Sequence, residues 1–270
     1  MEFFEVWWVF LIIAVASYLF GNLNTAILVS KAMGRDIRKE GSGNPGTMNM
    51  SRVFGVKTGL FILVLDIIKG VIPTLVAGLF FGDALFIGTT LPVALMARYC
   101  AGFFVVAGHI FPAFYKFKGG KGIASTIGVF LVAEWYIALI FGVVALAFIF
   151  ITRIGSMGSF LATTPPAIFA CIDVYTTYYK MAEQLNNTYI AYFIVINLFI
   201  LGIVFLTWFA HRQNIERLLS GDEHPTDWLQ MVKDLKLKKN PATVAEDKRD
   251  GSDDHAPDGG DAIGDKQVGK

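Results

Sequence analysis

Long hydrophobic runs separated by polar loops dominate this chain. A helix needs about 20 apolar residues to cross the hydrocarbon core of a bilayer, where no water is present to satisfy an unpaired backbone group. Clear candidates of this kind cover residues 6–29, 56–81, 158–178 and 189–210. The pattern predicts an all-α polytopic membrane protein.

Two further hydrophobic regions are interrupted by charged residues. Arg98 and a Leu-Pro pair break the region 84–112, so only residues 99–112 are expected to cross, as a short helix. Glu134 interrupts the region 122–151, which is long enough for one tilted helix or for two short helices hinged near this residue. The hydrophobic pattern alone leaves both alternatives open.

The distribution of Lys and Arg decides between these alternatives, because cytoplasmic loops collect such residues. The loop 31–57 has an excess of positive charge and belongs on the cytoplasmic side. With one helix in 122–151, Arg153 and the basic stretch 212–239 would lie outside, whereas with two helices they lie inside. We therefore expect seven transmembrane helices, some of them short, with the N-terminus outside and the C-terminus in the cytoplasm.

Composition supports this class of protein and indicates a separate tail. The chain is 54% hydrophobic with a mean hydropathy of +0.55, which excludes an ordinary soluble domain. Cys100 and Cys171 lie in apolar runs, where we expect them to pack rather than to form a disulfide or bind a metal. From Glu246 onward the chain is acidic and poor in large apolar residues. We predict an integral membrane domain over residues 1–225 and a disordered cytoplasmic tail over 226–270.

Polar segments far apart in the sequence fall at the same membrane face once this topology is adopted. They are residues 34–52, 115–124, 151–159 and 210–225. Each contributes glycines, hydroxyls, amides or cations, and few contribute carboxylates. We therefore expect the active-site loops to lie on the cytoplasmic face.

The segment 115–124 reads YKFKGGKGIA and combines closely spaced lysines with glycines. Glycine-rich turns allow consecutive N–H groups to point into one concavity, and adjacent cations add positive charge, so the segment is typical of a phosphate-binding loop. The alternative is a lysine cluster that grips anionic lipid headgroups, a role that requires no glycines. The spacing does not match a nucleotide P-loop. The segment GSGNPG at 41–46, taken alone, is either a glycine loop of the same kind or a simple turn.

Four motifs together resemble one family of enzymes. They are DIRKEGSGNPGTMNMSR (36–52), DIIKG (66–70), GHIFPAFYKFKGGKGIAS (108–125) and HRQNIERLLSGDE (211–223). Over roughly residues 10–224 the chain resembles the bacterial acyl-phosphate:glycerol-3-phosphate acyltransferase family. The resemblance implies a seven-helix protein of the bacterial inner membrane that transfers a fatty acyl group from acyl phosphate to the 1-hydroxyl of sn-glycerol 3-phosphate. The products would be lysophosphatidic acid and phosphate, in the first acylation step of phospholipid synthesis.

The resemblance also implies roles for individual residues. Catalytic roles fall on Ser42, Arg52, Lys121, His211 and Asn214. Substrate contacts fall on residues in or near the same motifs, namely Gly43, Asn44, Asn49, Lys118, Gly119, Gly120, Gly122, Ser159 and Glu223. The chain departs from the family's usual residues at 21–24, 46–49 and 153–156.

The residue types suit this chemistry. An acyl phosphate is already activated, so the enzyme's task is to hold two phosphates and orient one hydroxyl. The sequence has no His-x4-Asp motif, in which a histidine acts as general base. The resemblance implies instead that the phosphate of glycerol 3-phosphate is the base. We expect acyl phosphate and glycerol 3-phosphate as substrates at the lipid bilayer, with no cofactor, metal, nucleic acid or stable protein partner.

Other interpretations are left open by the sequence. Asp66 and Lys69 lie three residues apart within a membrane span, either as an internal ion pair that supports the loops or as functional charges. They slightly favour a transporter of an organic phosphate, although no repeat halves are present. A non-catalytic scaffold would leave the glycine loops unexplained. His109 is either a packing residue or a catalytic one.

Overall fold

The computed structural model describes residues 1–179, 187–223 and 226. The predicted tail, 226–270, lies outside these residues except for Thr226. Within the described part, the chain forms helices and an isolated β-bridge between Leu85 and Pro92, and no β-strand. The predicted all-α class is confirmed.

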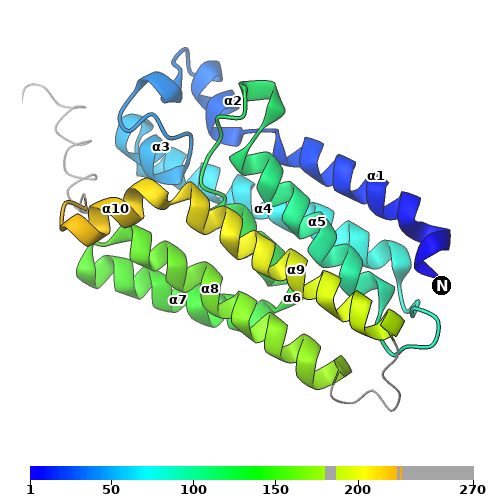
Figure 1. The fold of residues 1–270 in the computed structure, drawn as a ribbon. Helices are drawn as coiled ribbons and strands as arrows, with labels where there is room; N and C mark the ends of the chain where they lie inside the picture. The colour runs from blue at the N-terminus through cyan, green and yellow to red at the C-terminus, as the bar shows by residue number, and fades with distance from the viewer. Residues whose placement is uncertain (180–186, 224–225, 227–270) are drawn as a thin grey trace, which may run out of the picture. The chain divides into compact units, whose positions relative to one another are not determined.

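The helices follow the hydrophobic runs of the sequence (Figure 1). In chain order they are α1 (Phe3–Gly21), α2 (Thr25–Ala32), α3 (Thr47–Phe54), α4 (Val56–Phe81), α5 (Val93–Ile110), α6 (Ile123–Ala133), α7 (Trp135–Thr152), α8 (Gly155–Asp173), α9 (Asn187–Ala210) and α10 (Arg212–Ser220). Shorter helical turns are η1 (Ile37–Lys39), η2 (Ala113–Tyr115) and η3 (Val174–Tyr179).

In the described part of the chain, six segments are long and apolar enough to cross a membrane. They comprise α1 with α2, α4, α5 with η2, α7, α8 with η3, and α9. Helix α6 is apolar but has only 11 residues. The fold is therefore that of a multi-pass membrane protein, in which the short α6 accounts for the seventh predicted helix.

The region 122–151 forms two helices, which confirms the alternative that the charge distribution favoured. Helix α6 ends at Ala133 and α7 begins at Trp135. Between them Glu134 has a non-helical conformation, with φ of −136° and ψ of 55°. The hydrophobic region is therefore not one tilted helix.

The predicted short helix 99–112 is wrong in its start. Helix α5 begins at Val93, because Pro92 takes the N-cap position, where the N–H that proline lacks is not required. Arg98 lies inside α5 with its side chain across Gly78 of α4, since a Cβ on Gly78 would lie 2.4 Å from Arg98 Nε. A glycine on the neighbouring helix thus provides the space in which this long side chain lies within the bundle.

The predicted span 6–29 is not one continuous helix. Helix α1 ends at Gly21 and α2 begins at Thr25. Between them Asn24 caps α2, because its side-chain oxygen accepts a hydrogen bond from the Ile27 N–H at 3.0 Å. Two helical segments in succession therefore cover the first hydrophobic run.

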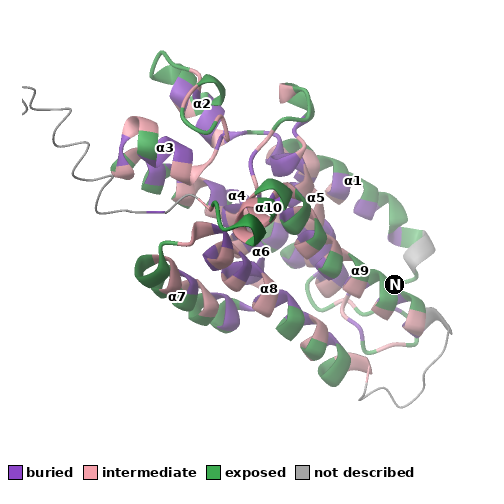
Figure 2. Ribbon diagram, turned by 60° about the vertical axis from the view of Figure 1, so that its left-hand side comes forward, coloured by how far each residue is buried: buried purple, intermediate pink, exposed green. Residues whose placement is uncertain are grey.

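Helix α5 occupies the centre of the bundle. It packs against α1, α4, α6 and α9, and most of its residues are buried (Figure 2). At its crossing with α1, a Cβ on Gly21 would lie 3.0 Å from Gly108 Cα, and a Cβ on Gly108 would lie 2.2 Å from Tyr18 O. Helices approach this closely only where both lack a side chain at the contact.

The polar helices gather at one end of the bundle. Figure 1 shows α2, α3 and α10 together at this end and Met1 at the other. The amphipathic α10 lies at the C-terminal end of α9, and α3 leads directly into α4. The helix bundle therefore brings together segments that the sequence separates by more than 150 residues, as the predicted topology required.

Replacing Gly108 by Ala should destabilise the protein, because the new Cβ would overlap the Tyr18 carbonyl, a backbone atom that cannot move aside. Overpacking of this kind costs about 1–3 kcal/mol, which corresponds to a fall in Tm of roughly 2–4 °C per kcal/mol for a chain of this size. Thermal unfolding in detergent measures the effect. Gly142→Ala is the matched control, since a Cβ there meets nothing within 4 Å. Equal Tm values for the two variants would contradict the close α1–α5 contact.

Candidate functional site

A glycine-containing loop connects α5 to α6 and forms the centre of the candidate site. We call residues 118–122 the glycine loop. The chain turns before it through two successive residues with left-handed backbone conformations, Lys116 (φ 55°) and Phe117 (φ 59°). The Gly119 and Gly120 N–H groups then donate hydrogen bonds to the carbonyls of Ile110 and His109, both at 3.2 Å. These bonds satisfy carbonyls that the end of α5 leaves free and fix the loop against that helix.

The glycines of this loop are required by close contacts. A Cβ on Gly119 would lie 2.1 Å from the His109 carbonyl oxygen, and a Cβ on Gly120 would lie 2.3 Å from His109 Nε2. The same Cβ on Gly120 would lie 3.1 Å from the carbonyl oxygen of Pro45, which belongs to the loop between η1 and α3. The glycine loop is therefore held between the end of α5 and a segment more than 60 residues earlier.

Helix α6 begins directly after the glycine loop and offers unpaired N–H groups. Its N-cap, Gly122, has φ of +80°, and no side chain caps the helix. The first helical bond runs from the Thr126 N–H to the Gly122 carbonyl, so the N–H groups of residues 123–125 have no acceptor within the helix. Such a helix start favours a bound anion.

This arrangement changes the predicted role of the loop amides. The glycine pattern leads one to expect consecutive loop N–H groups that face a phosphate. The N–H groups of Gly119 and Gly120 instead bond to α5, so the donors open to an anion are those at the start of α6, beside Lys121.

Lys121 contacts the C-terminal part of the described chain. Its Nζ donates a hydrogen bond of 2.5 Å to Asn214 Oδ1 on α10. The Asn214 side-chain amide in turn lies 3.4 Å from Glu223 Oε1, and Arg217 Nε lies 3.7 Å from Glu223 Oε2. Helix α10 and the residues that follow it thus bring an amide, a guanidinium and a carboxylate to the glycine loop.

Positive charge at this point exceeds negative charge. Burial and, after it, the charges of Arg217 and Arg52 together lower the pKa of Lys121 to about 8, although Glu223 opposes the shift. We call Arg52, Lys121 and Arg217 the cation cluster. With Glu223 as the carboxylate that acts on Lys121, the cluster favours an anion, which would stabilise the charged form of Lys121.

His211 lies beside the cation cluster at the N-cap of α10. Its Nδ1 lies 2.8 Å from the Thr207 carbonyl oxygen, and its ring meets the buried Phe160 ring edge-on at a centroid distance of 5.3 Å. Burial, followed by the charge of Lys121, lowers the pKa of His211 to about 4. The ring is therefore neutral at pH 7, donates from Nδ1 to Thr207, and presents Nε2 as an acceptor.

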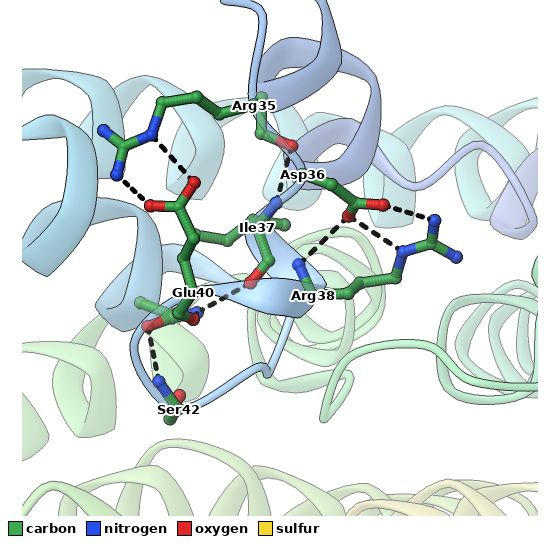
Figure 3. A network of polar contacts seen from close by, with 8 residues as sticks. Arg35, Asp36, Ile37, Arg38, Glu40 and Ser42 are labelled. Atoms are coloured by element: carbon green, nitrogen blue, oxygen red, sulfur yellow. Dashed lines mark hydrogen bonds and ion pairs between the residues drawn. The ribbon is translucent and has the colours of Figure 1, made fainter.

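The loop between α2 and α3 is held by its own polar side chains. Ion pairs join Arg35 to Glu40 and Asp36 to Arg38 (Figure 3). Asn49 is buried, accepts a hydrogen bond from the Ser42 N–H at 3.0 Å, and donates to the Glu40 carbonyl at 2.9 Å. Its second amide N–H bonds to the Ile37 carbonyl at 3.3 Å, so Asn49 holds the shape of this loop.

The predicted site residues divide into groups. Side-chain contacts bring together Lys121, Asn214 and Glu223, with Arg52 and His211 close enough to change the pKa of Lys121 or to respond to it. Ser42, Gly43 and Asn44 lie in the loop that Asn49 holds, and Gly119, Gly120 and Gly122 shape the glycine loop. For two other predicted residues, no described contact joins the side chain to Lys121 or its neighbours. Lys118 is exposed, and Ser159 donates to the Gly155 carbonyl of its own helix.

Sequence reasoning missed Arg217, Thr207 and Pro45. Arg217 follows Asn214 by three residues and so lies on the same face of α10, a spacing that could have identified it. Thr207 and the Pro45 carbonyl act through backbone contacts with distant segments, for which the sequence carries no signal.

Proteins similar to this chain share one description. Residues 11–221 match the profile of the glycerol-3-phosphate acyltransferase family. The glycerol-3-phosphate acyltransferase of Mycoplasmopsis pulmonis (strain UAB CTIP) is 36% identical over 79% of this chain and 92% of its own length. That of Halalkalibacterium halodurans is 35% identical over 79% of this chain and 93% of its own.

Solved structures agree with these sequence relatives. PlsY, an integral membrane glycerol 3-phosphate acyltransferase, superposes with a TM-score of 0.65 in its glycerol 3-phosphate form and 0.64 in its lysophosphatidic acid form. Both comparisons show 30% sequence identity and cover 83% of this chain and 98% of the other.

Lys121→Ala should weaken the binding of inorganic phosphate by about 10- to 100-fold, because a hydrogen bond to a charged group contributes roughly 1.5–3 kcal/mol. Isothermal titration calorimetry of the protein in detergent measures the affinity. Lys116→Ala is the control, since Lys116 is exposed and precedes the glycine loop. Equal losses in the two variants would instead support a diffuse lysine surface that grips lipid headgroups.

Proposed function

Because this chain belongs to the glycerol-3-phosphate acyltransferase family, we propose that its cation cluster holds the phosphates of an acyl-transfer reaction. The protein transfers a fatty acyl group from acyl phosphate to the 1-hydroxyl of sn-glycerol 3-phosphate, which gives lysophosphatidic acid and phosphate. The observation that carries this assignment is the excess of positive charge around the half-buried Lys121, next to the open start of α6. An acyltransferase that uses two phosphorylated substrates requires such a site.

The geometry suits the demands of this reaction. Acyl phosphate is a mixed anhydride whose leaving group is phosphate, so a strong acid is not needed at the leaving oxygen. Cations and N–H groups that are already in place stabilise the charge that develops on the departing phosphate. Arg52 belongs to α3, whereas Asn214 and Arg217 belong to α10, so two elements of the chain would hold the reacting groups. Ser42, in the loop before α3, would join Arg52 on the substrate.

His211 is suited to orient the glycerol hydroxyl rather than to deprotonate it. A general base works best when its pKa is near the operating pH, and the pKa of His211 is about 4. The phosphate of glycerol 3-phosphate, whose second pKa is about 6 in water, is the stronger base of the two. We therefore propose that this phosphate accepts the proton of the 1-hydroxyl while the Asn214 amide donates a hydrogen bond to the oxygen of that hydroxyl. His211 Nε2, which can only accept, would hold the neighbouring 2-hydroxyl of the same glycerol and so orient the substrate.

The proposed setting is the bacterial inner membrane, with the N-terminus outside and the C-terminus in the cytoplasm. Support comes from the basic residues of the α2–α3 loop and of α10, which lie at the end of the bundle opposite Met1 (Figure 1). Acyl phosphate would dissolve in the bilayer through its chain and reach the site from the membrane. Residues 1–225 would then form the acyltransferase domain and residues 226–270 a cytoplasmic tail, with no cofactor or stable protein partner.

The rate of transfer should fall as pH rises above about 8. Lys121 is charged below its pKa of about 8 and loses its proton above it, so kcat/KM should decline roughly tenfold per pH unit on the alkaline side. Lys121→Arg keeps the charge and should remove most of this decline, because a guanidinium does not titrate in this range. Arg52, Arg217 and Glu223 remain in both proteins. An identical alkaline decline in Lys121→Arg would show that another group is responsible.

The purified enzyme should use palmitoyl phosphate and not palmitoyl-CoA as its donor. The described site has cations and a helix start for a phosphate, and the sequence has no P-loop or dinucleotide motif for the adenosine part of coenzyme A. Formation of lysophosphatidate from glycerol 3-phosphate, measured with each donor, tests this, and inorganic phosphate should inhibit the reaction. Comparable rates with the two donors would overturn the donor assignment.

A further inference from the structure

Ionisable side chains that the proposed mechanism does not use lie beneath the glycine loop, inside the helices. They are Asp66 and Lys69 of α4 and His109 of α5, which we call the buried triad. Their residues are 2%, 3% and 4% exposed. Charges so fully removed from water are costly unless every one is paired and hydrogen-bonded, so the triad requires a physical explanation.

Lys69 has an acceptor for each N–H of its ammonium group. Its Nζ lies 3.1 Å from the Leu23 carbonyl oxygen, 3.1 Å from Asp66 Oδ1 and 2.9 Å from His109 Nδ1. Asp66 Oδ1 also accepts a hydrogen bond of 2.6 Å from the Thr25 hydroxyl at the start of α2. Lys69 therefore connects the break between α1 and α2 to the last turn of α5.

This geometry determines the orientation of the His109 ring. With Nδ1 as the acceptor from Lys69, a neutral ring carries its proton on Nε2. Nε2 lies against Gly120, where a Cβ would be only 2.3 Å away. The backbone of the same segment is fixed as well, because the His109 and Ile110 carbonyls accept the N–H groups of Gly120 and Gly119. The next residue along the chain is Lys121.

We infer that the buried triad positions the glycine loop, and through it Lys121, for acyl transfer. Asp66 fixes Lys69, Lys69 fixes the ring of His109, and the ring supports Gly120 from below. The three are positioning residues, since they act on the proposed substrate site through the glycine loop and through Ser125 in the first turn of α6, whose hydroxyl lies 3.4 Å from His109 Nδ1. The inference rests on the proposed function, and it assigns to these residues a part in that function rather than in ion transport.

A cluster of charges achieves what apolar packing could not. Apolar side chains of similar volume would fill the same space at no cost in stability, but they can slide and rotate against a loop without side chains. Hydrogen bonds to Nδ1 and to backbone carbonyls leave the ring one orientation. A displacement of about 1 Å in a positioning group can reduce turnover about 100-fold, which makes such an orientation valuable at the glycine loop.

Lys69→Met tests this inference, because it keeps the length of the side chain and removes all three hydrogen bonds. We expect kcat to fall about 100-fold or more while the protein remains folded by thermal unfolding in detergent. Thr74→Val is the matched control: Thr74 is also buried in α4, but its hydroxyl bonds only to the Gly70 carbonyl of its own helix. This control should retain the parent kcat.

The pH profile separates positioning from stability. If the loop moves, the distances from Lys121 to the charged and titratable groups around it change, namely to Arg52 of α3, His211, Arg217 and Glu223. The pKa of Lys121 then changes, so the pH at which kcat/KM declines should shift in Lys69→Met. A residue that only stabilises the fold would lower Tm and leave the pH at which activity declines unchanged. An unchanged profile together with parent-like kcat in Lys69→Met would overturn the inference.

Gly120→Ala tests the other end of the connection and does not depend on a buried charge. The added methyl group would meet His109 Nε2, so the kcat of Gly120→Ala should fall. The kcat of His109→Ala should fall as well, because the ring that supports the loop is lost. In the double variant the space left by the ring admits the methyl group, so the two effects should not add. Additive effects would show that the ring and the loop act independently, which would overturn the inference even if Lys69→Met failed to fold.

Inorganic phosphate binding, measured on the same variants, separates this inference from the proposed function. A parent protein that binds phosphate but transfers no acyl group would refute the proposed function, whereas the triad would still be supported if Lys69→Met and Gly120→Ala bound phosphate at least tenfold more weakly. If the parent protein is fully active and both variants equal it in transfer and in phosphate binding, the role of the triad is refuted and the proposed function is not.

Discussion

Lys121 is a cation at a point where burial and the neighbouring guanidinium groups of Arg52 and Arg217 all oppose its charge. Glu223 compensates only in part. A group in this situation is most stable when an anion joins it, and the start of α6 supplies N–H groups at the same place. The proposed site therefore depends on an excess of positive charge that a bound phosphate would neutralise, and the remaining features of this end of the bundle hold the charged groups in place.

Backbone contacts hold the glycine loop, and with it Lys121, in a fixed position. The glycine loop is bonded to the final carbonyls of α5, and α5 in turn meets α1 at the Gly21–Gly108 crossing. Side chains at these glycines would overlap backbone or ring atoms of the neighbouring element and push the two elements apart. The glycines of the motif are thus required chiefly for packing, and only indirectly for the proposed phosphate, which Lys121 and the start of α6 would bind.

The sequence predicts the membrane class, most of the helices and the membrane end at which the site lies, because hydrophobic length and Lys and Arg placement are local properties. The start of α5 could not be predicted, since Arg98 is tolerated in a span only where Gly78 of another helix makes room for it. The residues of the cation cluster were identified from motifs, with the exception of Arg217. The hydrogen bonds by which Asn49 holds the loop could not be predicted, because their partners are backbone groups of other residues in the folded loop.

The central claim is that the Lys121 side chain contacts a substrate phosphate. Solid-state nuclear magnetic resonance on protein with labelled lysine side-chain nitrogen and bound glycerol 3-phosphate measures the nitrogen-to-phosphorus dipolar coupling directly. We expect a coupling that corresponds to a distance within about 4 Å, as a charge-assisted hydrogen bond requires. The coupling should disappear in Lys121→Arg, which binds phosphate without a labelled lysine at this position. A coupling that persists in that variant, or that is absent from the parent protein, would contradict the account.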